Sequence, residues 1–146
     1  MQPTVFHVFR IGVLVVLGLV ETACQSENPA APSPSVSFSV LDLEVGTGAE
    51  ATIGSAATVN YSGWLYDAGG PDNKGTLFDS SPGQGFSFVL GLGQVIVGWD
   101  QGIVGMRVGG TRRLIIPPDM AYGSRATGLI PPNSALVFDV ELLAVQ

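Results

Sequence analysis

The sequence predicts an α+β fold in which an antiparallel sheet of about five or six strands covers one short α-helix. Apolar and polar side chains alternate along several short runs, which is the pattern of strands with one buried face. Only one segment has the spacing of an amphipathic helix. The chain has 146 residues with 20 glycines and 10 prolines, which favours one compact, turn-rich domain over a helical bundle.

Two strands are expected in the first part of the folded region. Alternation over residues 36–45 indicates one edge strand or two short ones, which end at a glycine-rich turn. It resumes over residues 57–66, where Val59 and Tyr61 share one face. Residues 67–75 are rich in Gly, Asp, Asn and Pro, so we expect a loop after the second strand.

Three further strands follow along the chain. Residues 86–90 alternate and end at a glycine, and residues 112–116 end at two consecutive prolines, which cannot continue a strand ladder. In residues 136–142 the even-numbered positions are apolar, whereas Asp139 and Glu141 point the other way. This last strand therefore predicts a sheet with one dry face and one wet face.

The predicted helix lies between the third and fourth strands. Ile96, Trp99, Ile103 and Met106 fall at positions i, i+3, i+7 and i+10, which is helical spacing. Three glycines in the same stretch each weaken a helix by up to about 1 kcal/mol relative to alanine. The helix must therefore be short and must depend on packing against the sheet.

Composition excludes several classes of function. The formal net charge is −6, which argues against binding to a phosphate backbone. Cys24 is the single cysteine, so neither an intramolecular disulfide nor a thiolate metal cluster is possible. The single histidine, His7, lies in the expected leader. The mature domain then lacks the groups for Ser-His-Asp catalysis, Cys-His catalysis or His-ligated zinc, and we expect no metal and no cofactor.

Residues 1–23 have the pattern of a signal peptide. Arg10 gives a positive start, and the apolar run 11–20 is too short for a membrane span, which needs about 20 residues. The following Glu21-Thr22-Ala23-Cys24 resembles the lipobox of bacterial lipoproteins, although Glu21 stands where that pattern prefers an apolar residue. The resemblance implies a lipidated Cys24. Cleavage elsewhere and an uncleaved anchor remain alternatives.

Residues 24–35 form a Pro- and Ser-rich segment with almost no apolar bulk. Such a composition is typical of a solvated spacer with polyproline character, or of a disordered tail. A spacer after a lipidated cysteine would hold the folded domain, residues 36–146, away from a membrane. We therefore expect an exported protein, periplasmic or on the cell surface, which contacts the membrane through a lipid anchor alone.

Short motifs then follow in a specific order along the folded region. They are Val59-Asn60-Tyr61-Ser62-Gly63, Gly75-Thr76-Leu77-Phe78-Asp79-Ser80-Ser81, Phe86-Ser87-Phe88, Val95-Ile96-Val97-Gly98-Trp99-Asp100, Ile116-Pro117-Pro118, Ala121-Tyr122-Gly123, Ile130-Pro131-Pro132-Asn133 and the run from Leu136 to Leu143. Each motif alone is weak. Together, over residues 40–146, they closely resemble the FKBP-type peptidyl-prolyl cis–trans isomerase domain.

The resemblance implies a curved antiparallel sheet wrapped around a short helix, with an aromatic cleft between them and Trp99 at its floor. It implies that Phe86 lines this cleft while Phe88 packs in the core. In the family, the backbone N–H at the position of Ile96 and the hydroxyl at the position of Tyr122 anchor substrate carbonyls. The implied catalytic residues are Tyr61, Phe78, Asp79, Trp99, Tyr122 and Phe138, and the implied substrate-binding residues are Phe86, Val95, Ile96 and Ile130.

The chain departs from well-known family members at the rim of the cleft. The segment 82–85 lacks the Arg that often pairs with the Asp at the position of Asp79, so Asp79 is more solvated or has another partner, for which Arg125 is a candidate. The insertion 67–75 is longer, and the loop 124–128 is short and carries no His. These changes bear on substrate preference and inhibitor affinity more than on the basic activity.

The activity implied by the resemblance is rotation of X–Pro peptide bonds, which would speed the folding of exported proteins. The expected partners are flexible chains with X–Pro bonds and the macrolides tacrolimus and rapamycin, and the protein is expected to be a monomer.

Two alternatives remain. One is a non-catalytic module or chaperone that holds proline-containing segments in the same cleft, and the other is a tethered β-domain with an unrelated partner. The complete aromatic set favours the enzyme.

Overall fold

The computed structural model describes residues 35–81, 83 and 85–146. The predicted signal peptide, Cys24 and all of the predicted spacer except Ser35 lie outside the described residues. Within the part of the chain that is described, no helix is long and apolar enough to cross a lipid bilayer.

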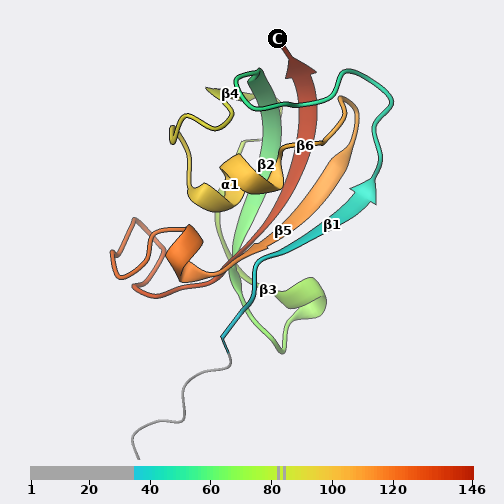
Figure 1. Ribbon diagram of the computed structural model, residues 1–146. Coiled ribbons are helices and arrows are strands. Elements are labelled where there is room, and N and C mark those ends of the chain that lie inside the picture. The colour runs from blue at the N-terminus through green and yellow to red at the C-terminus, as the bar shows by residue number, and fades with distance from the viewer. Residues whose placement is uncertain (1–34, 82, 84) are drawn as a thin grey trace, which may run out of the picture. The chain divides into compact units, whose positions relative to one another are not determined.

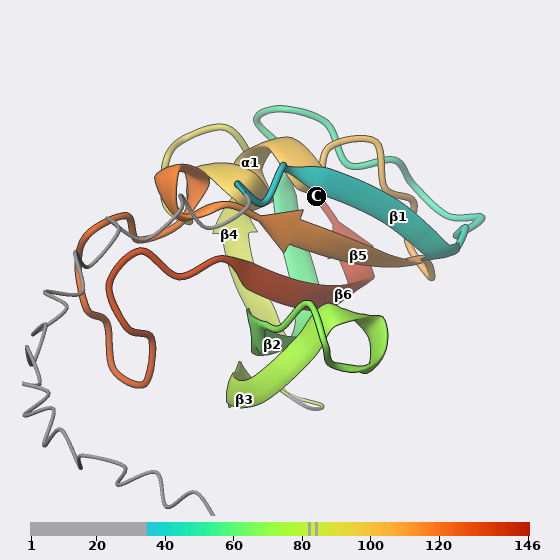
Figure 2. The same cartoon turned by 90° about the horizontal axis from the view of Figure 1, so that it is seen from below.

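The described residues form a six-stranded antiparallel sheet, as Figures 1 and 2 show. The strand order is β1-β5-β6-β2-β3, and β4 pairs with the start of β2 on the same side as β3. This sheet and its single short helix confirm the predicted fold class. The strands are β1 (Ser39–Glu44), β2 (Ala56–Tyr66), β3 (Lys74–Ser80), β4 (Phe86–Val89), β5 (Thr111–Ile116) and β6 (Leu136–Val145).

Strand β3 is the element that the alternation pattern does not reveal. It follows a short 3-10 helix, η1 (Pro71–Asn73), and forms one edge of the sheet beside β2. Two β-bulges interrupt its pairing with β2, so its residues do not keep a period of two. A second 3-10 helix, η2 (Pro118–Met120), follows β5 at the prolines that were predicted to end that strand.

The helix α1 (Val97–Gly102) lies across one face of the sheet, as Figure 1 shows. It is as short as the sequence predicted, and its glycines are the reason that it packs so closely. A β-carbon on Gly98 would lie 2.5 Å from Cγ2 of Ile116, and one on Gly102 would lie 2.6 Å from Cδ2 of Leu114. The residues that weaken the isolated helix therefore allow it to approach β5.

The core lies between α1 and this inner face of the sheet. Its fully buried members come mainly from alternate positions of the strands and from the helix region: Val59, Leu90, Ile103, Leu114, Ile116, Leu136, Val140 and Leu142. The outer face differs from the predicted wet face at one place. Val137 points outward but is fully buried, because Trp64 and Ile115 flank it on the neighbouring strands.

Candidate active site

A cavity of about 180 Å³ opens between α1 and the inner face of the sheet. Aromatic and aliphatic side chains make most of its wall, and the polar side chains of Asp79, Gln94 and Tyr122 lie among them. The predicted site residues, except Ile130, gather around it. The lining residues are Tyr61, Phe78, Asp79, Phe86, Gln94, Val95, Ile96, Trp99, Tyr122 and Phe138.

Trp99 lies at the centre of the aromatic wall. The helix α1 presents its ring, which is 4% exposed, to the side chains of the sheet. The ring centroid lies 5.0 Å from that of Tyr61 and 5.3 Å from that of Phe138, both edge to face. The indole Nε1 is buried and has no hydrogen-bond partner among the described residues. Trp99 is therefore held by packing, which leaves an apolar floor under the cavity.

Phe78 and Asp79 both line the cavity although they are consecutive residues of one strand. Consecutive strand residues normally point to opposite faces. Here Gly63 pairs with Asp79, while the next residue of β2, Trp64, pairs with Leu77, so Phe78 is the extra residue of a β-bulge. A bulge of this kind re-aims a side chain, and it turns the ring of Phe78 toward the cavity beside Asp79.

Gly63 creates the space into which the bulge turns that ring. A β-carbon at this position would lie 2.7 Å from Cζ of Phe78 and 2.7 Å from Cε1 of Phe138. The two rings meet edge to face over the glycine, with centroids 5.5 Å apart. The site therefore depends on a missing side chain as well as on the aromatic ones.

Phe86 and Phe88 lie on one face of β4, as residues two apart on a strand must. Their rings stack with centroids 5.7 Å apart. Phe86 is 41% exposed and lines the cavity, whereas Phe88 is 4% exposed and packs beneath it against Trp99. The structure thus places Phe86 at the cavity and Phe88 in the core, as expected.

The hydrogen-bond partner of Asp79 is Tyr61, in place of the Arg that is found in many family members. The Tyr61 hydroxyl donates to Oδ2 of Asp79 at 2.6 Å, and the backbone N–H of Ser80 donates to Oδ1 at 2.8 Å. Arg125 is not the partner, since no ion pair joins it to Asp79 in the described part of the chain. Burial, followed by the hydrogen bond and the charge of Asp79, raises the pKa of Tyr61 to about 12.

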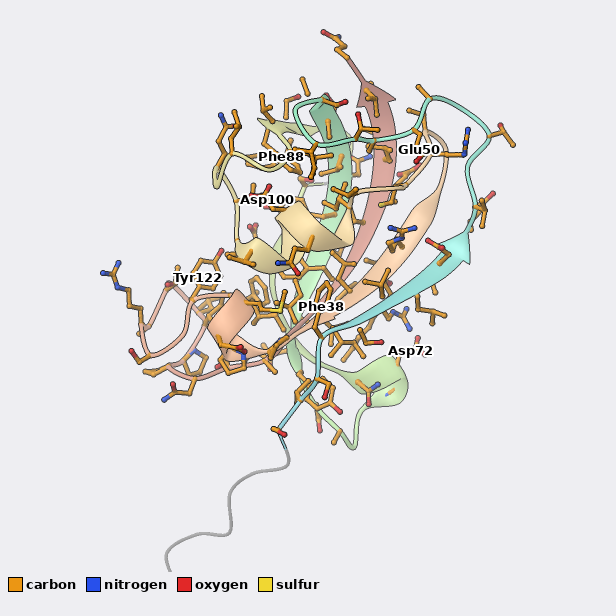
Figure 3. The ribbon with its side chains drawn as sticks, viewed as in Figure 1. Phe38, Glu50, Asp72, Phe88, Asp100 and Tyr122 are labelled. Atoms are coloured by element: carbon orange, nitrogen blue, oxygen red, sulfur yellow. The ribbon has the colours of Figure 1, made fainter. Side chains whose placement is uncertain are left out.

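Tyr122 supplies a second hydroxyl at the mouth of the cavity. It lies on the loop beside α1, as Figure 3 shows, and is 37% exposed. Its hydroxyl makes no side-chain hydrogen bond to any described residue. Burial, and then the negative charge of Asp79, raises the pKa of Tyr122. At neutral pH the hydroxyl therefore keeps its proton and can donate a hydrogen bond to a bound carbonyl.

The start of α1 offers a backbone donor. The carbonyl of Ile96 accepts the N–H groups of Trp99 and Asp100 at 2.9 and 3.2 Å, so Ile96 is the N-cap residue, immediately before the first residue of α1. The N–H of Ile96 donates to no acceptor within the described residues. Because Ile96 lines the cavity, its N–H is available to a ligand carbonyl.

Two side chains that the sequence did not indicate hold the loop before Ile96. Asp100 of α1 accepts the N–H groups of Gly91 and Gly93 at 3.0 and 2.9 Å, and Figure 3 shows where it lies on the helix. Gln94, which lines the cavity, accepts the N–H of Val89 through Oε1 at 2.9 Å. The one signal available in the sequence was an Asp in the first helical turn after a glycine-rich loop.

Ile130 does not line the cavity, contrary to the prediction. It is 5% exposed and belongs to the hydrophobic core. Its N–H and C=O both pair with the backbone of Thr127, at 2.8 and 3.0 Å, which closes a tight turn. Ile130 therefore stabilises the turn at residues 127–130, and its side chain is not part of the cavity wall.

The whole arrangement suits binding rather than bond cleavage. The cavity has an apolar floor for a small ring, two donors at its edge for carbonyl oxygens, and a carboxylate already occupied by Tyr61. None of the lining residues is a Ser, Cys, His or Lys that could act as a nucleophile.

Comparison with known proteins gives consistent matches. The sequence model of the family described as FKBP-type peptidyl-prolyl cis-trans isomerase matches residues 48–143. The FK506-binding protein of Neisseria meningitidis serogroup A is 49% identical over 112 residues, which cover 75% of this chain and 96% of that protein. FK506-binding protein 1 of Dictyostelium discoideum is 49% identical over 107 residues, which cover 71% and 94%.

Solved structures agree with these sequence matches. The crystal structure of AtFKBP13 matches with a TM-score of 0.63 and 40% identity, over 75% of this chain and 93% of that chain. The crystal structure of FkpA from Escherichia coli matches with a TM-score of 0.61 and 41% identity, over 75% of this chain and 48% of that chain.

Proposed function

Because this chain belongs to the family of FKBP-type peptidyl-prolyl cis-trans isomerases, we propose that it rotates X–Pro bonds of exported proteins while they fold, with the aromatic cavity as its active site. The observation that carries the assignment of the site is the cavity itself. An almost fully buried Trp99 forms its floor, aromatic rings surround that floor, and two unoccupied donors stand at its edge.

The physical basis is the electronic structure of the peptide bond. Rotation is slow because the C–N bond has partial double-bond character, with a barrier of about 18–20 kcal/mol. The planar amide is dipolar, and the twisted transition state has lost much of that resonance. An apolar cavity that excludes water therefore disfavours the planar ground state relative to the twisted state. Each decrease of about 1.4 kcal/mol in the barrier raises the rate tenfold.

The residues divide this work by position. Trp99 stacks against the proline ring, and Tyr61, Phe78 and Phe138 surround the rotating carbonyl. The N–H of Ile96 and the hydroxyl of Tyr122 anchor neighbouring carbonyls, so that one side of the bond is held while the other turns. No proton has to be transferred.

The role of Asp79 follows from its hydrogen bond with Tyr61. A carboxylate that already accepts a hydroxyl at 2.6 Å is a fixed negative group and not a free base. Asp79 orients the Tyr61 ring and places negative charge near the twisting bond. Its function is electrostatic and positional.

The same cavity is also the proposed site for macrolide ligands. Several relatives are named FK506-binding proteins, and nine of the ten lining residues of this chain, all except Gln94, are those predicted from that family. We expect tacrolimus and rapamycin to compete with an X–Pro peptide for the cavity. Loss of isomerase activity on addition of either compound would measure that competition.

An exported location rests on the first 24 residues. A positive residue, a short apolar run and a lipobox-like Cys24 support a leader that is removed and a lipid anchor that remains. Labelling of cells with a radioactive fatty acid, compared between the wild type and Cys24→Ala, tests the anchor. Label that persists in the variant would exclude lipidation at this cysteine.

The deciding experiment for activity is the rate of cis-to-trans relaxation of a short X–Pro peptide in the presence of the purified protein. We expect acceleration by the wild type and loss of acceleration in Phe78→Ala, with circular dichroism to show that the variant is folded. If the folded wild type does not accelerate any of several peptides, the cavity is a binding site for proline-containing segments without catalysis.

A further inference from the structure

An ion-pair network covers the outer face of the sheet, on the side opposite the cavity. Nζ of Lys74 lies 2.6 Å from Oδ2 of Asp139, and Nε of Arg113 lies 2.7 Å from Oδ1 of the same carboxylate. Nη1 of Arg113 also lies 3.2 Å from Asp72. Burial alone would raise the pKa of Asp139, but the hydrogen bonds from Arg113 and Lys74 outweigh burial and lower it.

Lys74 spans a whole strand to reach its partner. It begins β3, whereas Asp139 belongs to β6, and β2 lies between these two strands. On the way, the Lys74 ammonium lies 4.0 Å above the centroid of the Trp64 ring of β2, which adds a cation–π contact. Lys74 thus joins the edge strand to both of the next two strands by its side chain.

The first half of strand β3 has few other restraints, whereas its end is tied to Tyr61 through Asp79 and Ser81. It is an edge strand, so a single neighbour, β2, supplies its ladder. Two bulges interrupt that ladder, one at Phe78 and one between Leu77 and Lys74. The turn before it contains Asp72 and Asn73 with φ of 55° and 59°, a region that side chains other than glycine rarely adopt. Figure 3 shows Asp72 on this turn. Its carboxylate forms the ion pair with Arg113.

We propose that Lys74 is a positioning residue of the isomerase. Its ion pair with Asp139 fixes the bulged edge strand that presents Phe78 and Asp79 to the cavity on the other face. The proposal rests on the proposed function only in that Phe78 and Asp79 are taken as parts of the active site. It assigns a role in activity to a side chain that does not touch the cavity.

If the ion pair had only a structural role, loss of the Lys74 charge would not change isomerase activity. A partly buried pair contributes little net stability, because desolvation of the two charges offsets most of their attraction. Asp139 also keeps Arg113 when Lys74 is changed. Loss of the Lys74 charge should therefore change stability little, while β3 loses one of the restraints that set its position. Activity and stability separate the two roles.

The experiment compares three variants of the full-length protein. Lys74→Met keeps the apolar stem against Trp64 and removes the charge. Lys74→Arg restores a charged donor. Arg107→Met breaks another ion pair, with Glu50 at 2.9 Å, between two residues that lie outside the six strands, and serves as the control. We expect kcat/KM for an X–Pro peptide to fall about fivefold in Lys74→Met. Arg107→Met should match the wild type, and Lys74→Arg should recover most of the loss.

A spectroscopic signal reports the position of β3 independently of activity. The N–H of Ser80 donates to Asp79 Oδ1, and the Tyr61 hydroxyl donates to Oδ2. We expect NMR signals of the Ser80 amide and the Tyr61 ring to shift in Lys74→Met and to return in Lys74→Arg. A structural ion pair on the outer face would leave both signals unchanged.

The outcomes distinguish this proposal from the proposed function. If Lys74→Met retains the activity and the NMR signals of the wild type, while Phe78→Ala is inactive, Lys74 has no positioning role and the isomerase assignment stands. If the wild type itself is inactive, the proposed function is wrong. The Ser80 and Tyr61 signals then decide alone whether Lys74 fixes β3.

Discussion

The hydroxyl of Tyr61 on β2 donates a 2.6 Å hydrogen bond to the carboxylate of Asp79 on β3, across two neighbouring strands that both carry cavity residues. Because the phenol must keep its proton to donate, the bond favours the protonated form of Tyr61. The same bond fixes the carboxylate that would otherwise be an exposed charge at the cavity. This pair links the pH dependence of stability to the geometry of the site.

We expect the Tyr61 hydroxyl to stabilise the fold at neutral pH and to lose that effect in alkali. Its pKa is 10.0 in the unfolded chain and about 12 in the folded protein. A raised pKa gives a stabilisation that is complete below the unfolded value and is lost as pH rises through the folded value. The window is therefore between about pH 10 and about pH 12.

Urea denaturation of the wild type and Tyr61→Phe at about pH 8 and about pH 11 measures this effect. The difference between the two proteins isolates Tyr61 from the other groups that titrate in alkali. We expect the wild type to be the more stable protein at the lower pH and the gap to narrow at the higher pH. A gap of equal size at both values would show that the hydrogen bond does not favour the protonated phenol.

A side chain at Gly63 should damage the site and the fold together. A β-carbon there would lie 2.7 Å from the rings of both Phe78 and Phe138. We expect Gly63→Ala to lower the free energy of unfolding by roughly 1–3 kcal/mol, as overpacking does, and to reduce isomerase activity. Gly69→Ala is the matched control, because the nearest atom to its β-carbon would be 3.5 Å away. Equal behaviour of the two variants would contradict the steric argument.

The substitution Gly98→Ala has two opposite effects on stability, one through helix propensity and one through packing. Alanine in place of glycine favours a helix by up to about 1 kcal/mol. The added β-carbon, however, would lie 2.5 Å from Ile116, which is fully buried and cannot move aside. Overpacking of roughly 1–3 kcal/mol should prevail, so we expect Gly98→Ala to lower the melting temperature. The control is Gln101→Ala, at an exposed position of the same helix, which should leave the melting temperature nearly unchanged. A higher melting temperature for Gly98→Ala would show that α1 can move away from β5.

Phe86 and Phe88 should separate activity from stability. Phe88 is 4% exposed, so Phe88→Ala should cost about 3–5 kcal/mol of stability. Phe86 is 41% exposed and removes less apolar area from water, so Phe86→Ala should cost only roughly 1–2 kcal/mol. Among folded variants, we expect the larger rise in KM for Phe86→Ala, which loses part of the cavity wall. Peptide kinetics measure KM for both variants, and denaturation curves measure their stability. A larger rise in KM for Phe88→Ala than for Phe86→Ala would contradict the placement of Phe86 at the cavity wall and Phe88 in the core.

The sequence predicted the parts of this fold in which burial imposes a period. Alternation located β2, β4 and β6, because one face of each packs on the core, and helical spacing located α1 around Trp99. It missed β3, because the bulge at Phe78 breaks the alternation. That same bulge brings Phe78 and Asp79 to one cavity, so the feature that hid the strand is also the one that builds the site.

Two further features were not predicted correctly from the sequence: the position of Ile130 and the ion pair between Lys74 and Asp139. Ile130 was expected at the cavity from its motif, but its orientation depends on the turn that it closes with Thr127. Lys74 and Asp139 are 65 positions apart, so no local pattern relates them. Loop geometry and long-range pairing appear only when the strands are assembled in space.

Asp100 gives the last prediction, because it holds the loop that leads to the backbone donor of Ile96. Its two carboxylate oxygens accept the N–H groups of Gly91 and Gly93. Asp100→Ala leaves both donors without this acceptor, which should cost about 1 kcal/mol of stability at this partly exposed place. The loop that sets the Ile96 N–H should loosen, so we expect KM for an X–Pro peptide to rise more than kcat falls. Asp100→Asn keeps one acceptor oxygen, so its KM should lie between the KM of the wild type and that of the alanine variant. If Asp100→Ala lowers kcat and leaves KM unchanged, the loop does not anchor the substrate, and the Ile96 N–H acts only in the transition state.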